Sequence, residues 1–128
     1  MNATITPIFT DKATPPGGHY SQAVTHGGLI YVSGQLGFEA GRTDPVVGTI
    51  EQQTKNCLAN MQAILKAAGS DLSKVIKTTV YVSHVDHWPA VNRAYAECFG
   101  DHKPARAIVP CGKLHHGFDV EIDAIAEG

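Results

Sequence analysis

The stretch VEIDAIA, residues 120–126, decides the fold. Valine, isoleucine and two alanines occupy every second position, and Glu121, Asp123 and Ile125 occupy the positions between them. A period of two residues is typical of a β-strand, in which neighbouring side chains point to opposite faces of a sheet. Residues 120–126 therefore predict a strand that carries both acids on one face.

Arg106 precedes Glu121 by fifteen positions (121 − 106) and lies in a second short run, residues 105–109, that also predicts a strand. We expect the two strands to be neighbours, so that Arg106 and Glu121 face one pocket. A guanidinium grips a substrate carboxylate at two points, and a carboxylate held nearby orders and polarises a water molecule. This pair of side chains therefore predicts the hydrolysis of a small acid.

Four further runs are alternating or rich in β-branched residues and predict strands. Two of them are separated by Gly27-Gly28, a connection that is typical of a hairpin because glycine adopts the positive φ angles of such turns. The four predicted strands are residues 4–9, 23–25, 29–35 and 75–82.

Two helices are expected between the strands. Thr49 and Gln52 have the spacing of a capping box at the start of the first helix, and Gly69 fits a left-handed stop at its end. Asp86 can cap the second helix, whose first turn tolerates Pro89. The expected inner faces are Leu58, Met61, Leu65 and Ala68 on the first helix and Val91, Tyr95 and Cys98 on the second.

The order strands, helix, strand, helix, strands predicts an α+β fold with a mixed β-sheet and two helices packed on one face. The length of 128 residues fits a single domain, residues 1–128. Two helices cannot cover both faces of such a sheet. We therefore expect copies of the same chain to cover the other face, in an assembly closed as a ring.

Composition argues against several classes of protein. The formal charge of −2 argues against a nucleic-acid-binding surface. No stretch approaches the roughly 18 apolar residues of a membrane span, and residues 1–10 show no targeting pattern. Cys57, Cys98 and Cys111 contain no CxxC pair, which indicates a reducing compartment, and the first two are expected to be small buried hydrophobes. We expect a cytoplasmic protein with no nucleic-acid or membrane partner.

Several short motifs follow one another from about Gly18 to Ala126. They are Tyr20-Ser21-Gln22-Ala23, Ser33-Gly34-Gln35, Asn56, the helix end with Leu65, Ala67 and Gly69, Asn92 with Tyr95 and Phe99, Pro104-Ala105-Arg106, and Val120-Glu121-Ile122 before Ala124-Ile125-Ala126. In this order they resemble the Rid family, the reactive intermediate deaminases that are also called YjgF-like proteins.

The resemblance implies a chorismate-mutase-like fold, a homotrimer with a pocket in each cleft between subunits, and hydrolysis without a cofactor. The substrates implied are small carboxylate-bearing enamines or imines of the 2-aminoacrylate type, and the products are 2-keto acids and ammonia. Arg106 would hold the substrate carboxylate, and Glu121 would orient the attacking water. The implied substrate-binding residues are Tyr20, Ser33, Gly34 and Asn92, with backbone groups near Ile108.

Plainer interpretations stay open for these residues. Arg106 can be a surface ion-pair partner, and Glu121 can be purely structural. Ser33 has no partner base and is not expected to be a nucleophile. Cys111 lies between Arg106 and Glu121 in the sequence and can line the pocket.

The histidines leave the substrate open. His84 and His87 flank a strand-to-helix turn instead of sharing one helix face, so we expect no metal. His115 and His116 stand where the family usually has proline after a leucine, and His19 replaces another usual proline. Extra donors near the pocket can hold a second carboxylate, as in 2-aminomuconate, an intermediate of aromatic-acid breakdown. The alternative is that they are solvated loop histidines.

Two other functional classes remain. The first is a non-catalytic metabolite-sensing or regulatory trimer, since a fold does not by itself determine a chemistry. The second is RNA cleavage, which the acidic balance of charge disfavours.

Overall fold

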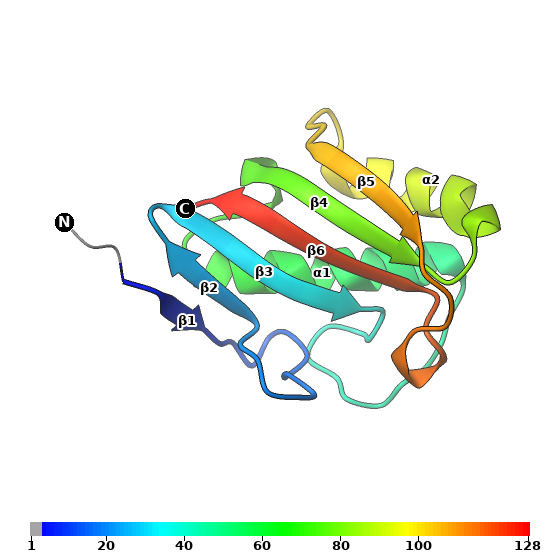
Figure 1. Ribbon diagram of the computed structural model, residues 1–128, viewed down its shortest axis with the longest axis horizontal. Coiled ribbons are helices and arrows are strands. Elements are labelled where there is room, and N and C mark those ends of the chain that lie inside the picture. Colours follow the sequence, from blue (N-terminus) through cyan, green and yellow to red (C-terminus); the bar gives the residue numbers. More distant parts are fainter. Residues whose placement is uncertain (1–3) are drawn as a thin grey trace.

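The computed structural model describes residues 4–128, which form one mixed sheet of six strands with two helices (Figure 1). The helices are α1 (Ile50–Ala67) and α2 (Trp88–Phe99), and the 3-10 turns are η1 (Leu72–Lys74), η2 (Val85–His87) and η3 (His115–Gly117). The strands are β1 (Thr6–Ile8), β2 (Ala23–His26), β3 (Leu29–Leu36), β4 (Val75–Val82), β5 (Ala105–Pro110) and β6 (Val120–Glu127).

The strand β6 lies inside the sheet, whose order is β1-β2-β3-β6-β4-β5. It pairs antiparallel with β3 on one side and with β4 on the other. Among the described strands only β4 and β5 pair in parallel, because the connection between them crosses over through α2. The expectation that β5 and β6 are neighbours is therefore wrong: this crossover places β5 at the outer edge, with β4 between the two.

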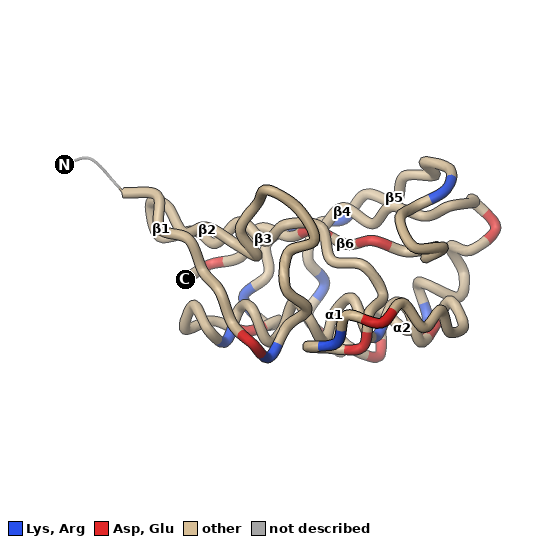
Figure 2. The backbone as a smooth tube through the Cα atoms, turned by 90° about the horizontal axis from the view of Figure 1, so that it is seen from below, with Lys and Arg blue, Asp and Glu red and all other residues tan. Residues whose placement is uncertain are grey.

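Both helices pack against the same face of the sheet, as predicted (Figure 2). The apolar positions of β6 face them, and each is at most 3% exposed. Burying a valine or isoleucine side chain contributes about 1.5–3 kcal/mol, so the two-residue period of this strand fixes which face meets the helices. The buried positions are Val120, Ile122, Ala124 and Ala126 on β6 and Cys57, Leu58, Met61, Ile64 and Leu65 on α1.

The opposite face of the sheet is covered by neither helix (Figure 2). Glu121 and Asp123 lie on this face, as the alternation in β6 predicts. It also carries apolar side chains, since Tyr31 is 39% exposed and Val109 is 37% exposed. We call this side the open face.

The predicted hairpin and the predicted start and end of α1 are present. Gly27 and Gly28 have φ angles of 59° and 82° between β2 and β3. The Thr49 hydroxyl accepts a hydrogen bond from the Gln52 backbone N–H at 3.1 Å, but the Gln52 side chain donates to Asn56 instead of returning to the cap. The capping box is thus half formed. Gly69, with φ of 81°, ends the helix as expected.

The start of α2 differs from the prediction. Asp86 lies in η2, where its backbone N–H donates to His84 Nδ1 at 3.1 Å. The residue before the helix is His87, which makes no capping hydrogen bond, because η2 runs directly into α2. Pro89 lies in the first turn, as expected. On the inner face Val91, Tyr95 and Phe99 are buried and Cys98 is half-buried.

The other two cysteines have different environments. Cys57 is fully buried in α1, and burial raises the pKa of its thiol far above the usual range. Cys111 is exposed just after β5.

Of the two helices between residues 4 and 128, neither is long and apolar enough to cross a membrane.

Candidate functional site

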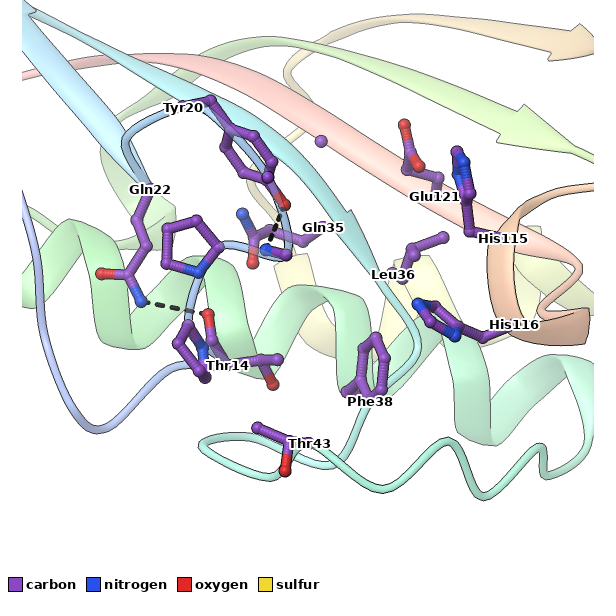
Figure 3. A pocket seen from close by; sticks show the side chains of 15 residues that line it. Thr14, Tyr20, Gln22, Gln35, Leu36, Phe38, Thr43, His115, His116 and Glu121 are labelled. Carbon is purple, nitrogen blue, oxygen red and sulfur yellow. Dashed lines mark hydrogen bonds between the residues drawn. The ribbon is translucent and has the colours of Figure 1, made fainter.

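A cavity of about 520 Å³ opens at one end of the sheet (Figure 3). Its walls come from residues 14–22, the end of β3, residues 38–43, η3 and β6. We call it the Glu121 pocket. Five of the predicted site residues line it, namely Tyr20, Gly34, His115, His116 and Glu121.

Glu121 and Gly34 approach each other closely in this pocket. Gly34 falls where the pairing of β3 with β6 shifts register between Val32 and Gln35, an irregularity typical of a β-bulge. A Cβ atom at position 34 would lie 2.5 Å from Glu121 Oε2 and 2.9 Å from its Cδ. Only glycine leaves this space for the carboxyl group.

Burial raises the pKa of the Glu121 carboxyl, because desolvation disfavours the charged form. The positive charge of His115 lowers this pKa and the negative charge of Asp123 raises it, but burial has the largest effect. A carboxyl group with a raised pKa can accept and return a proton at a pH nearer neutrality than an ordinary glutamate can. Glu121 is therefore suited to general acid–base chemistry.

The Gln22 side chain holds residues 10–14, the segment that leads into the wall of the pocket beginning at Thr14. This amide is 1% exposed, accepts a hydrogen bond from Thr10 N–H at 2.7 Å, and donates to the carbonyls of Thr10, Ala13 and Thr14. Gln22 thus fixes the backbone of this wall.

The buried Asn60 on α1 joins this wall to the next one. Its Oδ1 accepts from Thr14 N–H at 2.8 Å, and its Nδ2 donates to the Phe38 carbonyl at 2.8 Å. The sequence analysis missed this role of Gln22 and Asn60. A signal existed for Asn60, since this amide stands three positions after Cys57 and four before Ile64, beside the predicted apolar stripe.

Tyr20 and the two histidines stand at the rim of the pocket (Figure 3). Tyr20 is 49% exposed, and its hydroxyl accepts a hydrogen bond from Gly17 N–H at 3.2 Å. His116 has φ of 62°, the only positive value among the described residues other than glycine, and its ring meets that of Phe38 edge-on at 5.4 Å. This backbone turn brings His115 and His116 to the same pocket as Glu121.

Arg106 lies elsewhere, in a cluster between β5 and α2. Its Nη1 donates to Asn92 Oδ1 at 3.0 Å, and its guanidinium carbon lies 4.8 Å from the ring centre of Tyr95 and 5.9 Å from that of Trp88. Tyr95 is itself held by a 2.8 Å hydrogen bond with Thr78. We call Arg106, Asn92, Tyr95 and Trp88 the Arg106 cluster. Among residues 4–128 no carboxylate lies within 4.0 Å of this guanidinium.

The Arg106 cluster and the Glu121 pocket lie on opposite faces of the sheet. Arg106 is paired with Thr78, a buried residue on the helix side, whereas Glu121 is paired with Tyr81 on the open face. Paired residues point to the same face, so the side chains of Arg106 and Glu121 point in opposite directions. The expectation that both face one pocket therefore fails within a single chain.

The remaining predicted residues do not line the Glu121 pocket. The Ser33 hydroxyl donates to the Ser21 carbonyl at 2.7 Å. This side chain therefore makes a structural contact between two backbone segments. Ile108 packs against the core on the helix side. The exposed Cys111 directs its thiol to the Val82 carbonyl at 3.5 Å.

His84 and His87 belong to no metal site in the described part of the chain. Between residues 4 and 128 no three His, Cys, Asp or Glu side chains are grouped to hold a metal ion. His84 Nδ1 lies 3.4 Å from Asp86 Oδ2, and His87 Nε2 lies 3.8 Å from Asp119 Oδ1.

Comparison with known proteins adds a family and its relatives. The family model described as Endoribonuclease L-PSP matches residues 10–128. A RutC family protein of Pyrococcus abyssi is 41% identical over 119 residues, which cover 93% of this chain and 94% of the relative. A human protein named 2-iminobutanoate/2-iminopropanoate deaminase is 40% identical over 119 residues, or 93% of this chain and 87% of the relative. The crystal structure of Escherichia coli TdcF with bound serine is 29% identical, has a TM-score of 0.89, and is matched over 96% of this chain and 98% of that one.

Proposed function

We propose, because this chain belongs to the Rid family of YjgF-like proteins, that it hydrolyses small carboxylate-bearing imines and enamines to 2-keto acids and ammonia. The observation that carries the proposal is the half-buried Glu121 carboxyl, whose pKa is raised and whose space in a cavity of about 520 Å³ depends on Gly34. The name of the human relative supports this class of reaction. Assignment of all the individual site residues is part of this proposal.

The proposed reaction needs few catalytic groups. An enamine first tautomerises to an imine, whose carbon is an electrophile. Glu121 takes a proton from a water molecule as that water attacks the imine carbon, and returns the proton to the nitrogen. Glu121 then moves a second proton, from the hydroxyl of the resulting carbinolamine to its nitrogen, the C–N bond breaks, the carbonyl forms, and ammonia leaves. The protein contributes placement, desolvation and one proton-transferring group.

We propose that the substrate carboxylate is held by Arg106 of a second copy of the chain. Arg106 is a cation without a carboxylate partner among residues 4–128, and it lies on the face opposite to Glu121. One chain therefore cannot bring the two side chains to one substrate, but a homotrimer with its sites between subunits can. The exposed apolar side chains of Tyr31 and Val109 on the open face support such an assembly.

The other predicted residues have supporting roles in the proposed site. Asn92 orients Arg106, Gly34 makes room for Glu121, and Tyr20 adds a hydrogen bond at the rim. Ser33, Ile108 and Cys111 would approach the substrate through their backbone or only in the assembly. A cytoplasmic location likewise remains a prediction.

The direct test follows the products. The purified protein is mixed with 2-iminopropanoate generated in place, and the release of pyruvate and ammonia is measured. Arg106→Ala and Glu121→Gln should each abolish the protein-dependent rate. Arg93→Ala and Glu97→Gln are matched controls, because these exposed side chains form ion pairs on the helices, and both should keep the rate. Equal rates with and without the wild-type protein would overturn the proposal.

A longer dicarboxylate such as 2-aminomuconate is a second candidate substrate. His115 and His116 both line the pocket with Glu121, and the cavity continues to Thr43. These rings can donate to a second carboxylate. Measured at a pH above the acid limb of both reactions, the double variant with His115→Gln and His116→Gln should slow 2-aminomuconate turnover and spare 2-iminopropanoate. An equal effect on both substrates would exclude this assignment.

The same experiments address the non-catalytic alternative. A regulatory protein would bind a keto acid through Arg106, and Glu121→Gln would leave its function intact. RNA cleavage has less support, since Figure 2 shows acidic and basic residues interspersed along the helices and the net charge is −2.

A further inference from the structure

Trp88 is an exposed aromatic residue that the proposed chemistry does not use. It is the only tryptophan in the chain, it begins α2, and it is 44% exposed. A side chain this exposed contributes little to the core, so packing does not explain a tryptophan at this position. Its contact with the Arg106 guanidinium, at 5.9 Å from the ring centre, is the feature that distinguishes it from the other exposed apolar side chains.

The surroundings of Arg106 leave a defined part of its guanidinium free. Asn92 accepts one hydrogen bond from Nη1, and the rings of Tyr95 and Trp88 both lie within 6 Å of the guanidinium carbon. A guanidinium has five N–H donors in one plane, and aromatic rings attract the cation without using any of them. The aromatic contacts therefore restrict the position of the side chain and leave donors for a carboxylate.

The two aromatic residues differ in how firmly the fold holds them. Tyr95 is 6% exposed and is tied to Thr78 on β4, so it forms a fixed support under the guanidinium. Trp88 is open to solvent and lies in the first turn of the helix. It therefore contacts the guanidinium from a solvent-exposed position.

We infer that Trp88 is a positioning residue for Arg106, which keeps the guanidinium ready to bind a small carboxylate. The inference rests on the proposed function in that it takes Arg106 to be the carboxylate site. A cation–π contact at an exposed site is expected to change ligand affinity by about two- to fivefold.

The first measurement is binding of serine, the ligand in the Escherichia coli relative, followed by calorimetry. Trp88→Ala should weaken binding by about two- to fivefold, and Trp88→Phe should restore most of the affinity because it keeps an aromatic ring. Val85→Ala is the matched control, since Val85 is also exposed and lies in the turn before α2. It should leave the affinity unchanged.

The second measurement uses tryptophan fluorescence, which in this chain comes from Trp88 alone. Serine should change the emission of the wild-type protein and of Arg93→Ala, but not that of Arg106→Ala. A purely structural role for Trp88 predicts no such ligand response.

The outcomes separate this inference from the proposed function. Serine binding that depends on Arg106, together with unchanged affinity in Trp88→Ala or an emission that does not respond, overturns the role of Trp88 and leaves the carboxylate site intact. Absence of any Arg106-dependent binding in the wild type overturns the carboxylate site and the inference together.

Discussion

At position 34 the missing side chain matters as much as the carboxyl group beside it. Glu121 can occupy its place only because no Cβ atom projects from Gly34, and the β-bulge in β3 turns that position toward the pocket. The glycine and the glutamate act as one unit, although 87 positions (121 − 34) separate them in the sequence.

Gly34→Ala should therefore lower kcat strongly with little effect on folding. The new methyl group would lie 2.5 Å from Glu121 Oε2 and must displace the carboxyl group, and a shift of about 1 Å in a catalytic group can cost about 100-fold in rate. Turnover of 2-iminopropanoate and thermal unfolding measure the two effects. The same substitution in a Glu121→Gln background should add almost nothing, and a full additional loss there would show that Gly34 acts by another route.

The pH dependence of the reaction should report the environment of Glu121. Burial raises the pKa of this carboxyl, and the base must be deprotonated, so the rate should fall as the pH drops through that raised pKa. The positive charge of His115 lowers this pKa. His115→Gln should therefore move the acid limb of the kcat/KM profile to higher pH.

The raised pKa of Glu121 also predicts how the free energy of unfolding depends on pH. The folded protein holds the Glu121 proton more tightly than the unfolded chain does, so this residue's contribution is most favourable at low pH and is lost as the pH rises through the folded pKa. Urea unfolding of Glu121→Gln against wild type should show an advantage of the variant that grows with pH. An advantage that shrank as the pH rose would contradict the burial of this carboxyl.

At the scale of helices and strands, the sequence predicted those features that short local patterns determine. Periodicity located both helices and every strand, and Gly27-Gly28 and Thr49 marked a turn and a helix start. The sequence could not predict which strands are neighbours, because the position of β5 depends on how α2 packs. For the same reason it could not predict that Arg106 and Glu121 of one chain lie on opposite faces of the sheet, because a pairing register of one residue decides the face of each.

The walls of the pocket could not be predicted from the sequence either, because they depend on hydrogen bonds between segments that are far apart in the chain. Asn60 joins residues that lie 46 and 22 positions away. Asn60→Ala should leave the Thr14 N–H and the Phe38 carbonyl without partners and lower the free energy of unfolding by about 2–4 kcal/mol. Asn56→Ala, which loses a bond to Gly37 at a less buried position, should cost about 1 kcal/mol. Urea unfolding at one protein concentration compares them, and equal losses would contradict the anchoring role.

For the whole molecule, the decisive feature is that the Arg106 cluster and the Glu121 pocket, the two candidate sites, lie on opposite faces of one sheet. A shared site then needs a cation from one chain and a carboxylate from another. This arrangement predicts complementation between two inactive variants.

A 1:1 mixture of Arg106→Ala and Glu121→Gln chains, unfolded and refolded together, should recover about a quarter of the wild-type activity. This fraction follows because each site needs an intact Arg106 from one chain and an intact Glu121 from its neighbour, each with a chance of one half. Each variant refolded alone is the control. Activity that stays at zero in the mixture would show that the two residues do not meet across an interface.

The place of β6 inside the sheet also constrains when the protein can fold. Strands β1 to β3 form one half of the sheet and β4 with β5 the other, and only residues 120–127 join them. Because β6 follows the five other strands in the sequence, the ribosome must synthesise both halves before the piece that unites them. Until then each half exposes an unpaired strand edge, so the growing chain is most exposed to aggregation before β6 has been made.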